Sequence, residues 1–341
     1  PHTHVGVGLL FGVESGDFGM IERGPVEAAG LGWNLAPGDV AARFNIAHIA
    51  PAEKGFAVLD RRAGRIDQGV DELIRALNEN FTDFPVKIEF RRTQQHRGVL
   101  RLSGANLGHC ISDTDPGNVP MPADLPWSFA RDDSEASTNT AGLINQITRR
   151  AHEILDSHPE NQRRLASGLP PGNGILIRGV GLGAEPVSPP FGEQSRVAVV
   201  AGCSTVAGLS HILGFTIVSD PLFTADLNTD IDLKVQTAIA TSRDHDFVYL
   251  HFKAPDICAH DRDPEMKKAV IERLDKALAP LLSEDIVIGI CADHGTDSNT
   301  GWHIEDPVPA LLYDPSTAAE NGVVNFGESD CATGPLGNVK G

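Results

Sequence analysis

The side chains best suited to chemistry are carboxylates and imidazoles that follow two apolar runs in the second half of the chain. Asp256 and His260 form a D-x-x-x-H pair after the run FVYLHF. Asp293 and His294 are adjacent after the run IVIGICA, and His303 follows in a loop rich in Gly, Asn and Thr. Mixed Asp and His donors suit Zn²⁺ or Mn²⁺. The sequence therefore predicts a metal site built from these five side chains.

The adjacent Asp293 and His294 point to two ions, since consecutive residues at a strand exit face opposite sides and each can serve a different metal. The alternative is ordinary loop polarity, because the chain has 13 His and Asp is a common turn residue. Three such groups at successive strand ends are hard to explain as turn residues alone. We therefore favour the metal site.

The elements that must position these ligands are five apolar runs, which read as strands buried on both faces. They are GILIRGVG (174 to 181), RVAVVAG (196 to 202), FTIVSD (215 to 220), DFVYLHFKAPD (246 to 256) and DIVIGICADHG (285 to 295). Helical spacing of apolar residues lies between them, at 204–214, 230–243 and 264–282. Alternating strands and helices predict a doubly wound, mostly parallel α/β sheet, whose ligand loops meet beyond the carboxyl ends of the strands.

The region from about residue 24 to 170 has a different pattern of polar and apolar residues. Its half-polar strand patterns, DVAARFNIAHI, VKIEFRRTQ and HRGVLRLSG, surround one strong helix, QGVDELIRALNENF, and a long helix is expected from a cap at Ser137 towards Ser167. The prediction is an α/β core of residues 1–20 and 171–341, interrupted by an inserted α+β lid domain of residues 21–170.

Net charge and composition limit the classes of partner that the protein is expected to bind. A formal net charge of −18 and a pI near 5.0 argue against binding to nucleic acid or to an anionic membrane surface, so a small molecule is the expected partner. Five cysteines without a CxxC pattern suggest neither a disulfide framework nor a zinc knuckle. No apolar stretch is long enough to cross a bilayer and no leader opens the sequence, so the predicted location is the cytoplasm.

Five longer segments, in this order along the chain, resemble the archaeal-type cofactor-independent phosphoglycerate mutases of the alkaline phosphatase superfamily. They are RGPVEAAGLGWNLAPGDVAARFNIA (23 to 47), LDRRAGRI (59 to 66), SDTDP (112 to 116), KAPDICAHD (253 to 261) and ICADHGTDSNTGWHIEDPVPALLY (290 to 313). The resemblance implies an alkaline phosphatase-like core. It also implies interconversion of 3-phosphoglycerate and 2-phosphoglycerate with two divalent ions, Mn²⁺ or Zn²⁺ and possibly Mg²⁺, and without 2,3-bisphosphoglycerate.

The resemblance also implies how the metal ligands divide. Asp256, His260 and His303 would hold one ion, and Asp293 and His294 would help to hold the other. The second ion should need a further Asp from a DG motif near the N-terminus of the family, which the printed sequence lacks. We therefore expect residues upstream of this sequence, including the first core strand, and we expect a chain without them to bind one ion poorly.

The family carries a Ser nucleophile in a GSDVA-like loop, and alignment on RGPVEA places Thr3 at that position, with His4 in place of the flanking acidic residue. A Thr hydroxyl can serve as nucleophile once a metal lowers its pKa. The alternative is that Thr3 is only the start of a frayed chain terminus and has no catalytic role.

Arginines suit the phosphate and carboxylate of a phosphorylated hydroxy acid, because their guanidinium forks bind such anions bidentately. Strand alternation places Arg43 and Asn45 on one face, and Arg178 stands in an apolar run, where it needs an anionic partner. Each arginine is by default a solvated surface charge. The resemblance raises six residues above that default as substrate-binding candidates: Arg43, Asn45, Arg62, Arg65, Arg97 and Arg178.

Three departures from the family keep other functions open: Ala207 where members often carry a Lys, Gly117 where a DTDPH-like motif would end in His, and Thr3 itself. They affect phosphate and substrate handling and leave the metal ligands intact. A metal-dependent phosphohydrolase or another small-metabolite phosphotransferase would use the same metals and nucleophile. A catalytically silent relative that only binds a ligand is a third alternative.

Overall fold

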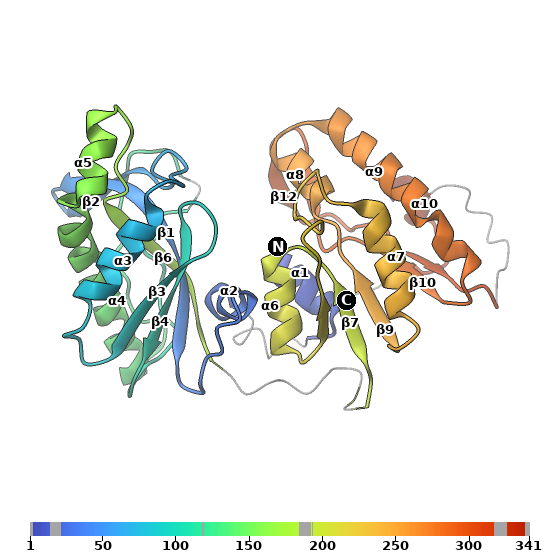
Figure 1. The fold of residues 1–341 in the computed structure, drawn as a ribbon, viewed down its shortest axis with the longest axis horizontal. Coiled ribbons are helices and arrows are strands. Elements are labelled where there is room, and N and C mark those ends of the chain that lie inside the picture. Colours follow the sequence, from blue (N-terminus) through green and yellow to red (C-terminus); the bar gives the residue numbers. More distant parts are fainter. Residues whose placement is uncertain are drawn as a thin grey trace. The chain divides into compact units, whose positions relative to one another are not determined.

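The computed structural model describes residues 3–13, 22–117, 119–183, 192, 194–316 and 326–337 (Figure 1). The chain divides into two compact units. Unit 1 comprises Pro1–Gly16 and Pro186–Gly341, and unit 2 comprises Asp17–Glu185.

Unit 2 is built on a six-stranded antiparallel sheet. Five strands follow the order β3-β4-β1-β2-β5, and β6 also pairs with β1. The bounds are β1 Val40–Ala52, β2 Gly55–Asp60, β3 Lys87–Arg92, β4 Arg97–Ser103, β5 Ala123–Asp124 and β6 Gly174–Leu182. The first half of β1 pairs with both β4 and β6, and its second half pairs with β2 after a register shift at His48. Residues in the first half of β1 are therefore held from both edges.

Three helices pack on this sheet: α2 (Arg23–Gly30), α3 (Val70–Asn80) and α4 (Glu135–Asp156). A further helix, α5 (Pro159–Ala166), follows α4. In α3 the apolar residues recur at helical spacing and are buried, so this helix offers one face to the core. Alternate residues of β1, such as Phe44 and Ile46, join the main core with α3 and α4. The intervening Ala41 packs with Ala28 of α2 and Trp33. The side of the sheet that carries α2 therefore also carries Arg43 and Asn45.

The predicted cap of the long helix was wrong by three residues. Ser134, whose Oγ accepts a hydrogen bond from the Ser137 backbone N–H at 3.1 Å, is the N-cap, and Ser137 lies buried inside α4. The helix also ends at Asp156, and Pro159 begins the separate helix α5, because proline is readily accommodated in the first turn of a helix.

The predicted position of the run 174–181 was also wrong, because β6 belongs to the sheet of unit 2 and not to the α/β core. Ile175 and Ile177 of β6 lie in the cluster with α3 and α4, and Leu176 lies in a second cluster with Ile49 and Val58. An antiparallel strand covered on both faces has the same continuous apolar pattern as a buried parallel strand. The compact unit extends to Glu185 instead of residue 170.

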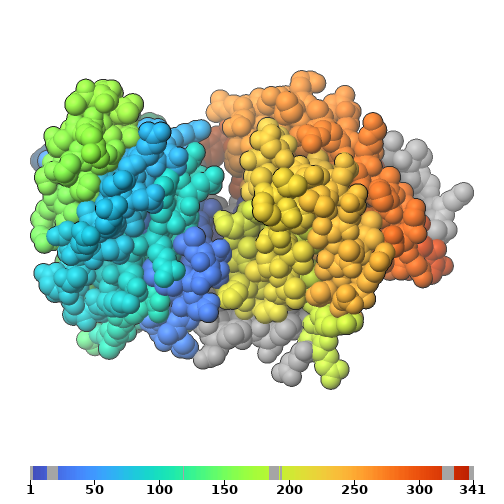
Figure 2. All heavy atoms as spheres, viewed as in Figure 1, coloured from blue at the N-terminus to red at the C-terminus, as the bar shows by residue number. Residues whose placement is uncertain are grey.

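Unit 1 contains a three-stranded parallel sheet of order β8-β7-β9, with bounds β7 Val197–Val200, β8 Thr216–Val218 and β9 Phe247–Leu250. The helices α6 (Ser204–Ile212) and α7 (Ile231–Thr241) connect the strands, and Asp230 caps α7 by accepting from the Leu233 N–H at 2.9 Å. The predicted parallel α/β arrangement is confirmed for these elements. In Figure 2 the yellow and orange segments that include α6, α7 and α9 form the face of unit 1 turned to the viewer.

Apart from helix α9, the remaining elements of unit 1 are short. They are α1 (Thr3–Leu10), α8 (Ala254–His260), α9 (Pro264–Leu278), a 3₁₀ helix (Ala279–Ser283), β10 (Ile288–Ile290), β11 (Gly295–Asp297), β12 (Trp302–Ile304), β13 (Leu311–Tyr313) and α10 (Glu328–Cys331). β10 pairs antiparallel with β13, and β11 pairs antiparallel with β12.

The prediction that all the core strands are buried on both faces was wrong. Only the central strand β7 is buried throughout, whereas β8 and β9 form the edges of the three-stranded sheet and β10 pairs, among the described residues, with β13 alone. Phe247 at the start of β9 is 45% exposed. The predicted strand 246–256 also stops at Leu250, because Pro255 and its neighbours begin α8. Among the helices of the described segments, none combines the length and the apolar composition needed to cross a membrane.

Candidate active site

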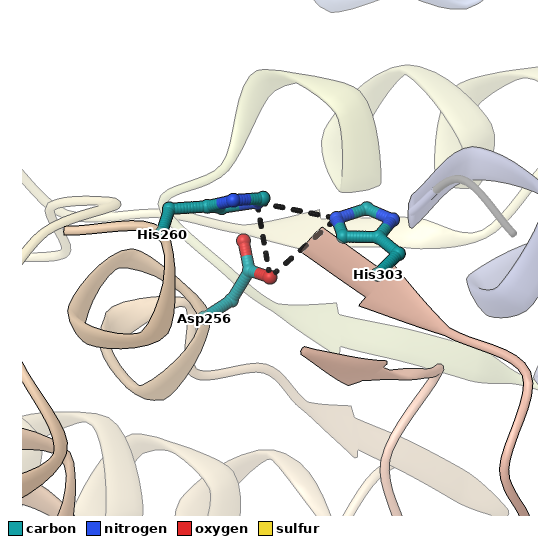
Figure 3. Close-up of side chains that lie close together, drawn as sticks. All are labelled: Asp256, His260 and His303. Atoms are coloured by element: carbon teal, nitrogen blue, oxygen red, sulfur yellow. Dashed lines mark hydrogen bonds and ion pairs between the residues drawn. The ribbon is translucent and has the colours of Figure 1, made fainter. Parts of the chain in front are cut away.

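Three of the predicted ligands converge in unit 1. Asp256 and His260 lie one turn apart on α8, and His303 lies on β12 (Figure 3). One ligand atom from each lies within 4.8 Å of the others. The Nε2 atoms of His260 and His303 are 3.2 Å apart, and both face Asp256 Oδ1, at 3.4 Å and 3.8 Å.

The tautomer of His260 fits a metal ligand. Its Nδ1 lies 2.8 Å from the carbonyl oxygen of Gly301. A carbonyl oxygen only accepts hydrogen bonds, so this contact places the proton of the neutral ring on Nδ1 and leaves a lone pair on Nε2. The donor set of one carboxylate and two imidazoles is typical of zinc and of other divalent ions. The residues present therefore fit a cation at this position.

Asp293 and His294 follow β10, and His294 adjoins the same cluster. The rings of His294 and His303 stack with centroids 3.8 Å apart. Asp293 Oδ2 and His294 Nε2 lie 3.2 Å apart, yet neither buried atom has a hydrogen-bond partner among the described residues. Buried polar atoms are normally paired, so two such atoms facing each other fit a cation between or beside them. Helix α1 packs closely here, because a Cβ on Gly6 would lie 2.4 Å from the Asp293 carbonyl oxygen.

Thr3 is connected to the cluster through a lysine that sequence reasoning missed. Thr3 is the first residue of α1, and its Oγ1 accepts a hydrogen bond from Lys253 Nζ at 3.1 Å. The same Nζ lies 2.7 Å from Asp256 Oδ2. The available signal was the spacing in KAPD, which places Lys253 one helical turn before Asp256.

The charge of Lys253 lowers the pKa of the Asp256 carboxyl. Burial raises the pKa of the Asp256 carboxyl, but the charge and hydrogen bond of Lys253, with smaller contributions from His260 and Thr296, lower the pKa by more, so that the net shift is downward. The carboxylate is therefore ionised at neutral pH, as a metal ligand must be.

The predicted arginines gather in unit 2. Arg43 on β1 lies opposite Arg178 on β6, and Asn45 lies opposite Arg97 on β4. The only carboxylate that contacts Arg43 among the described residues is Glu27 of α2, whose Oε1 lies 3.2 Å from Arg43 Nη1.

Glu27 is shared, because its Oε1 also lies 2.8 Å from Arg23 Nε. Burial, which is the largest cause, and the nearby cations Arg23, Arg178 and Arg97 together lower the pKa of Arg43 to about 9, against the opposing effect of Glu27. The cluster therefore carries more buried positive charge than its own carboxylate neutralises.

Several polar atoms of this cluster have no hydrogen-bond partner among the described residues. They are Arg43 Nε, Asn45 Oδ1, Arg97 Nε and Arg178 Nε. Arg178 comes only within 4.0 Å of Asp115, because Arg61 holds that carboxylate at 2.6 Å. Buried guanidinium donors beside an amide oxygen fit a ligand that carries both an anion and a hydroxyl group.

The other two predicted arginines differ in position. Arg62 and Arg65 are exposed in the turn after β2, where Asp60 accepts hydrogen bonds from the Arg62 and Gly64 N–H groups. The charge of Arg62 lowers the pKa of Arg97, which places Arg62 near the cluster. No contact in the described parts of the chain connects Arg65 to it.

Sequence reasoning missed His96, which immediately precedes Arg97 and is 2% exposed. Its Nδ1 has no hydrogen-bond partner in the described structure. Burial, which is the largest cause, and the charges of Arg97, Arg62 and Arg43 together lower the pKa of His96 to about 3. A buried neutral imidazole among arginines adds a polar group without adding charge.

Comparison with known proteins identifies two matching families. Residues 6–161 match the family described as 2,3-bisphosphoglycerate-independent phosphoglycerate mutase, and residues 193–341 match the metalloenzyme superfamily. A mutase of that name from Methanopyrus kandleri is 38% identical over 330 residues, which cover 94% of this chain and 76% of the relative. One from Thermococcus kodakarensis is 36% identical over 326 residues, 94% of this chain and 77% of the relative.

Two solved structures are also similar. A Pyrococcus horikoshii protein has a TM-score of 0.78 at 26% identity and covers 99% of this chain and 79% of its own. The cofactor-independent phosphoglycerate mutase of Thermoplasma acidophilum has a TM-score of 0.63 at 28% identity and covers 98% of this chain and 82% of its own. The matched residues span both the cation ligands and most of the arginines. The chain belongs to the 2,3-bisphosphoglycerate-independent phosphoglycerate mutase family.

Proposed function

We propose that this chain interconverts 3-phosphoglycerate and 2-phosphoglycerate by passing the phosphoryl group through the Thr3 hydroxyl. The observation that carries the proposal is the chain of contacts from Thr3 Oγ1 through Lys253 Nζ to Asp256, which connects a hydroxyl nucleophile to a cluster of cation ligands. Because phosphoglycerates are intermediates of glycolysis, the proposed location is the cytoplasm.

Two divalent ions, Mn²⁺ or Zn²⁺ with Mg²⁺ as a further candidate, complete the proposed site. Asp256, His260 and His303 would hold one ion, and Asp293 with His294 would contribute to the other, where their buried Oδ2 and Nε2 atoms are unpaired. When bound, such ions stabilise negative charge on the attacking oxygen and on the phosphoryl oxygens.

Lys253 has a role of its own in this proposal. Its ammonium donates to Thr3 Oγ1, so it stabilises negative charge that develops on that oxygen during attack. Its simultaneous contact with Asp256 fixes the lysine side chain, so the ammonium is in position before substrate arrives.

The arginine cluster of unit 2 supplies the proposed anion-binding groups. Arg43, Arg97 and Arg178 are strand residues with unpaired donors, and Asn45 offers an unpaired amide oxygen to a hydroxyl of the substrate. A phosphorylated hydroxy acid carries all the groups that these side chains complement. Arg62 is a candidate for the same role, and Arg65 remains a prediction from the sequence.

The test is incubation of the protein with Mn²⁺ and 3-phosphoglycerate, followed by phosphorus NMR. The expected result is 2-phosphoglycerate at the equilibrium ratio with no accumulation of inorganic phosphate. Inorganic phosphate as the sole product would replace the mutase by a phosphohydrolase. Absence of both products, with Mn²⁺ binding demonstrated by calorimetry, would favour a silent ligand-binding relative.

A further inference from the structure

We propose that the Thr296 hydroxyl couples the two sets of cation ligands, and that Thr296 is therefore a positioning residue for both. This inference deepens the proposed function, because it concerns the cations on which that function rests. Thr296 lies on β11 and is 7% exposed. It is paired in register with the ligand His303 on β12, so both side chains lie on the same face of the hairpin.

One contact of the hydroxyl reaches the first ligand set. Thr296 Oγ1 donates a hydrogen bond to Asp256 Oδ1 at 2.9 Å. The same Oδ1 faces His260 and His303, so the hydrogen bond fixes the carboxylate in the orientation that the three ligands share. Such outer contacts orient metal-binding side chains and tune their affinity.

The other contact reaches the second ligand set. His294 Nδ1 lies 3.3 Å from Thr296 Oγ1 and also 3.3 Å from the Gly295 carbonyl oxygen. Since the single hydroxyl proton of Thr296 is donated to Asp256, the oxygen can only accept from His294. Both neighbours of Nδ1 are therefore acceptors, which places the imidazole proton on Nδ1 and leaves the buried Nε2 lone pair for a cation.

The hairpin itself is anchored independently of any cation. Lys267 Nζ of α9 donates to the Thr296 carbonyl oxygen at 3.0 Å. Asp297 closes the turn by accepting from the Asn299 N–H at 2.9 Å and from Thr300 Oγ1 at 2.8 Å. The Thr296 hydroxyl is therefore held in place before a cation binds, and a side chain without the hydroxyl would lose both connections at once.

The test compares Thr296→Val, which keeps the shape of the side chain and removes the hydroxyl, with Thr296→Ser, which retains the hydroxyl. Zn²⁺ and Mn²⁺ binding to the whole protein is measured by calorimetry, with Thr241→Val as control, because the Thr241 hydroxyl bonds only within α7. The expected result is that valine weakens each resolved cation-binding step about 10- to 100-fold and serine restores it. Wild-type affinity in Thr296→Val, or a loss at one step only, would overturn the coupling.

A second measurement needs no variant. Long-range proton–nitrogen NMR of the metal-free wild-type protein reports which ring nitrogen of His294 carries the proton. A proton on Nδ1 is expected, and a proton on Nε2 would refute the proposed arrangement even if Thr296→Val does not fold. Neither readout depends on phosphoglycerate turnover, so a failed mutase assay and a failed coupling are distinguishable.

Discussion

The two candidate clusters hold their side chains in different ways. In unit 1 the cation ligands come from a short helix, a loop after β10 and a two-stranded hairpin, and side-chain hydrogen bonds such as those of Thr296 and Lys253 fix them. In unit 2 the proposed anion-binding residues Arg43, Arg97 and Arg178 stand on three adjacent strands of one sheet. The register of the backbone fixes these arginines.

This difference predicts how far the effect of a single substitution extends in each cluster. A ligand in a loop depends on its outer contacts, so a change beside it disturbs the ligand itself. A strand residue keeps its place when a neighbour is changed, because ladder hydrogen bonds on both edges of β1 hold the backbone. Substitution of a cation ligand in unit 1, or of Thr296 beside it, should therefore affect the whole cation site, whereas substitution of one arginine in unit 2 should act singly.

The largest effect is expected for Thr3→Ala. Removal of the proposed nucleophile should lower mutase activity at least about 10³-fold while Mn²⁺ binding is unchanged, because among the described contacts Thr3 touches the cluster only through Lys253. Coupled spectrophotometric turnover and calorimetry measure the two quantities. Thr3→Ser should retain activity, and a fully active Thr3→Ala protein would refute the assigned nucleophile.

His303→Ala should remove one ligand and also the ring on which His294 stacks. We expect Zn²⁺ affinity to fall more than about 100-fold, a larger loss than that expected for an outer-shell substitution. Equilibrium dialysis measures the affinity. His245→Ala is the matched control, since His245 contacts only the Thr241 carbonyl oxygen of α7 among the described contacts. Equal affinities in the two variants would contradict the cation site.

Arg97→Met should act on substrate alone. Removing one charged donor raises the KM for 3-phosphoglycerate about 10- to 100-fold, because hydrogen bonds to charged groups contribute about 1.5–3 kcal/mol. Mn²⁺ affinity should not change. Arg150→Met, which alters an exposed ion pair with Glu153, should leave KM as it is. An unchanged KM for Arg97→Met would remove Arg97 from the proposed anion site.

The remaining prediction concerns His96 and the stability of the fold in acid. Its pKa is about 3 in the folded protein against 6.5 for an unperturbed imidazole, so as pH falls through 6.5 the unfolded chain binds a proton that the folded chain does not bind. Stability contributed by the neutral imidazole is therefore lost between pH 6.5 and pH 3, at up to about 1.4 kcal/mol per pH unit.

Denaturant unfolding at several pH values measures this loss. His96→Gln should lower the slope of unfolding free energy against pH in that window, because glutamine does not titrate. Identical slopes in the variant and the wild type would show that His96 does not stay neutral in the folded protein.

Much of the candidate cation cluster was predictable because its residues lie close together in sequence. A helical D-x-x-x-H pair places Asp256 and His260 on one face of α8, and the adjacent Asp293 and His294 are evident by inspection. Lys253 was not predicted, although it lies three residues from Asp256. Its role depends on Thr3, which lies 250 residues away in the chain but whose Oγ1 is 3.1 Å from Lys253 Nζ.

The boundary of the α/β core was the main error. The apolar run of β6 is indistinguishable by pattern from a parallel core strand, and only its pairing with β1 assigns it to unit 2. His96 was missed for a similar reason, since burial among arginines depends on the register of β1 and β4.

The sequence by itself therefore determined the types of donor, their local spacing and the family, because these depend on residues near each other along the chain. Only the tertiary structure decided which side chains that are far apart in the sequence form hydrogen bonds or ion pairs with one another. The contacts of Thr3 with Lys253, of Thr296 with Asp256 and of Glu27 with Arg43 all join separate elements. Such contacts follow from the packing and register of whole elements, which no local pattern encodes.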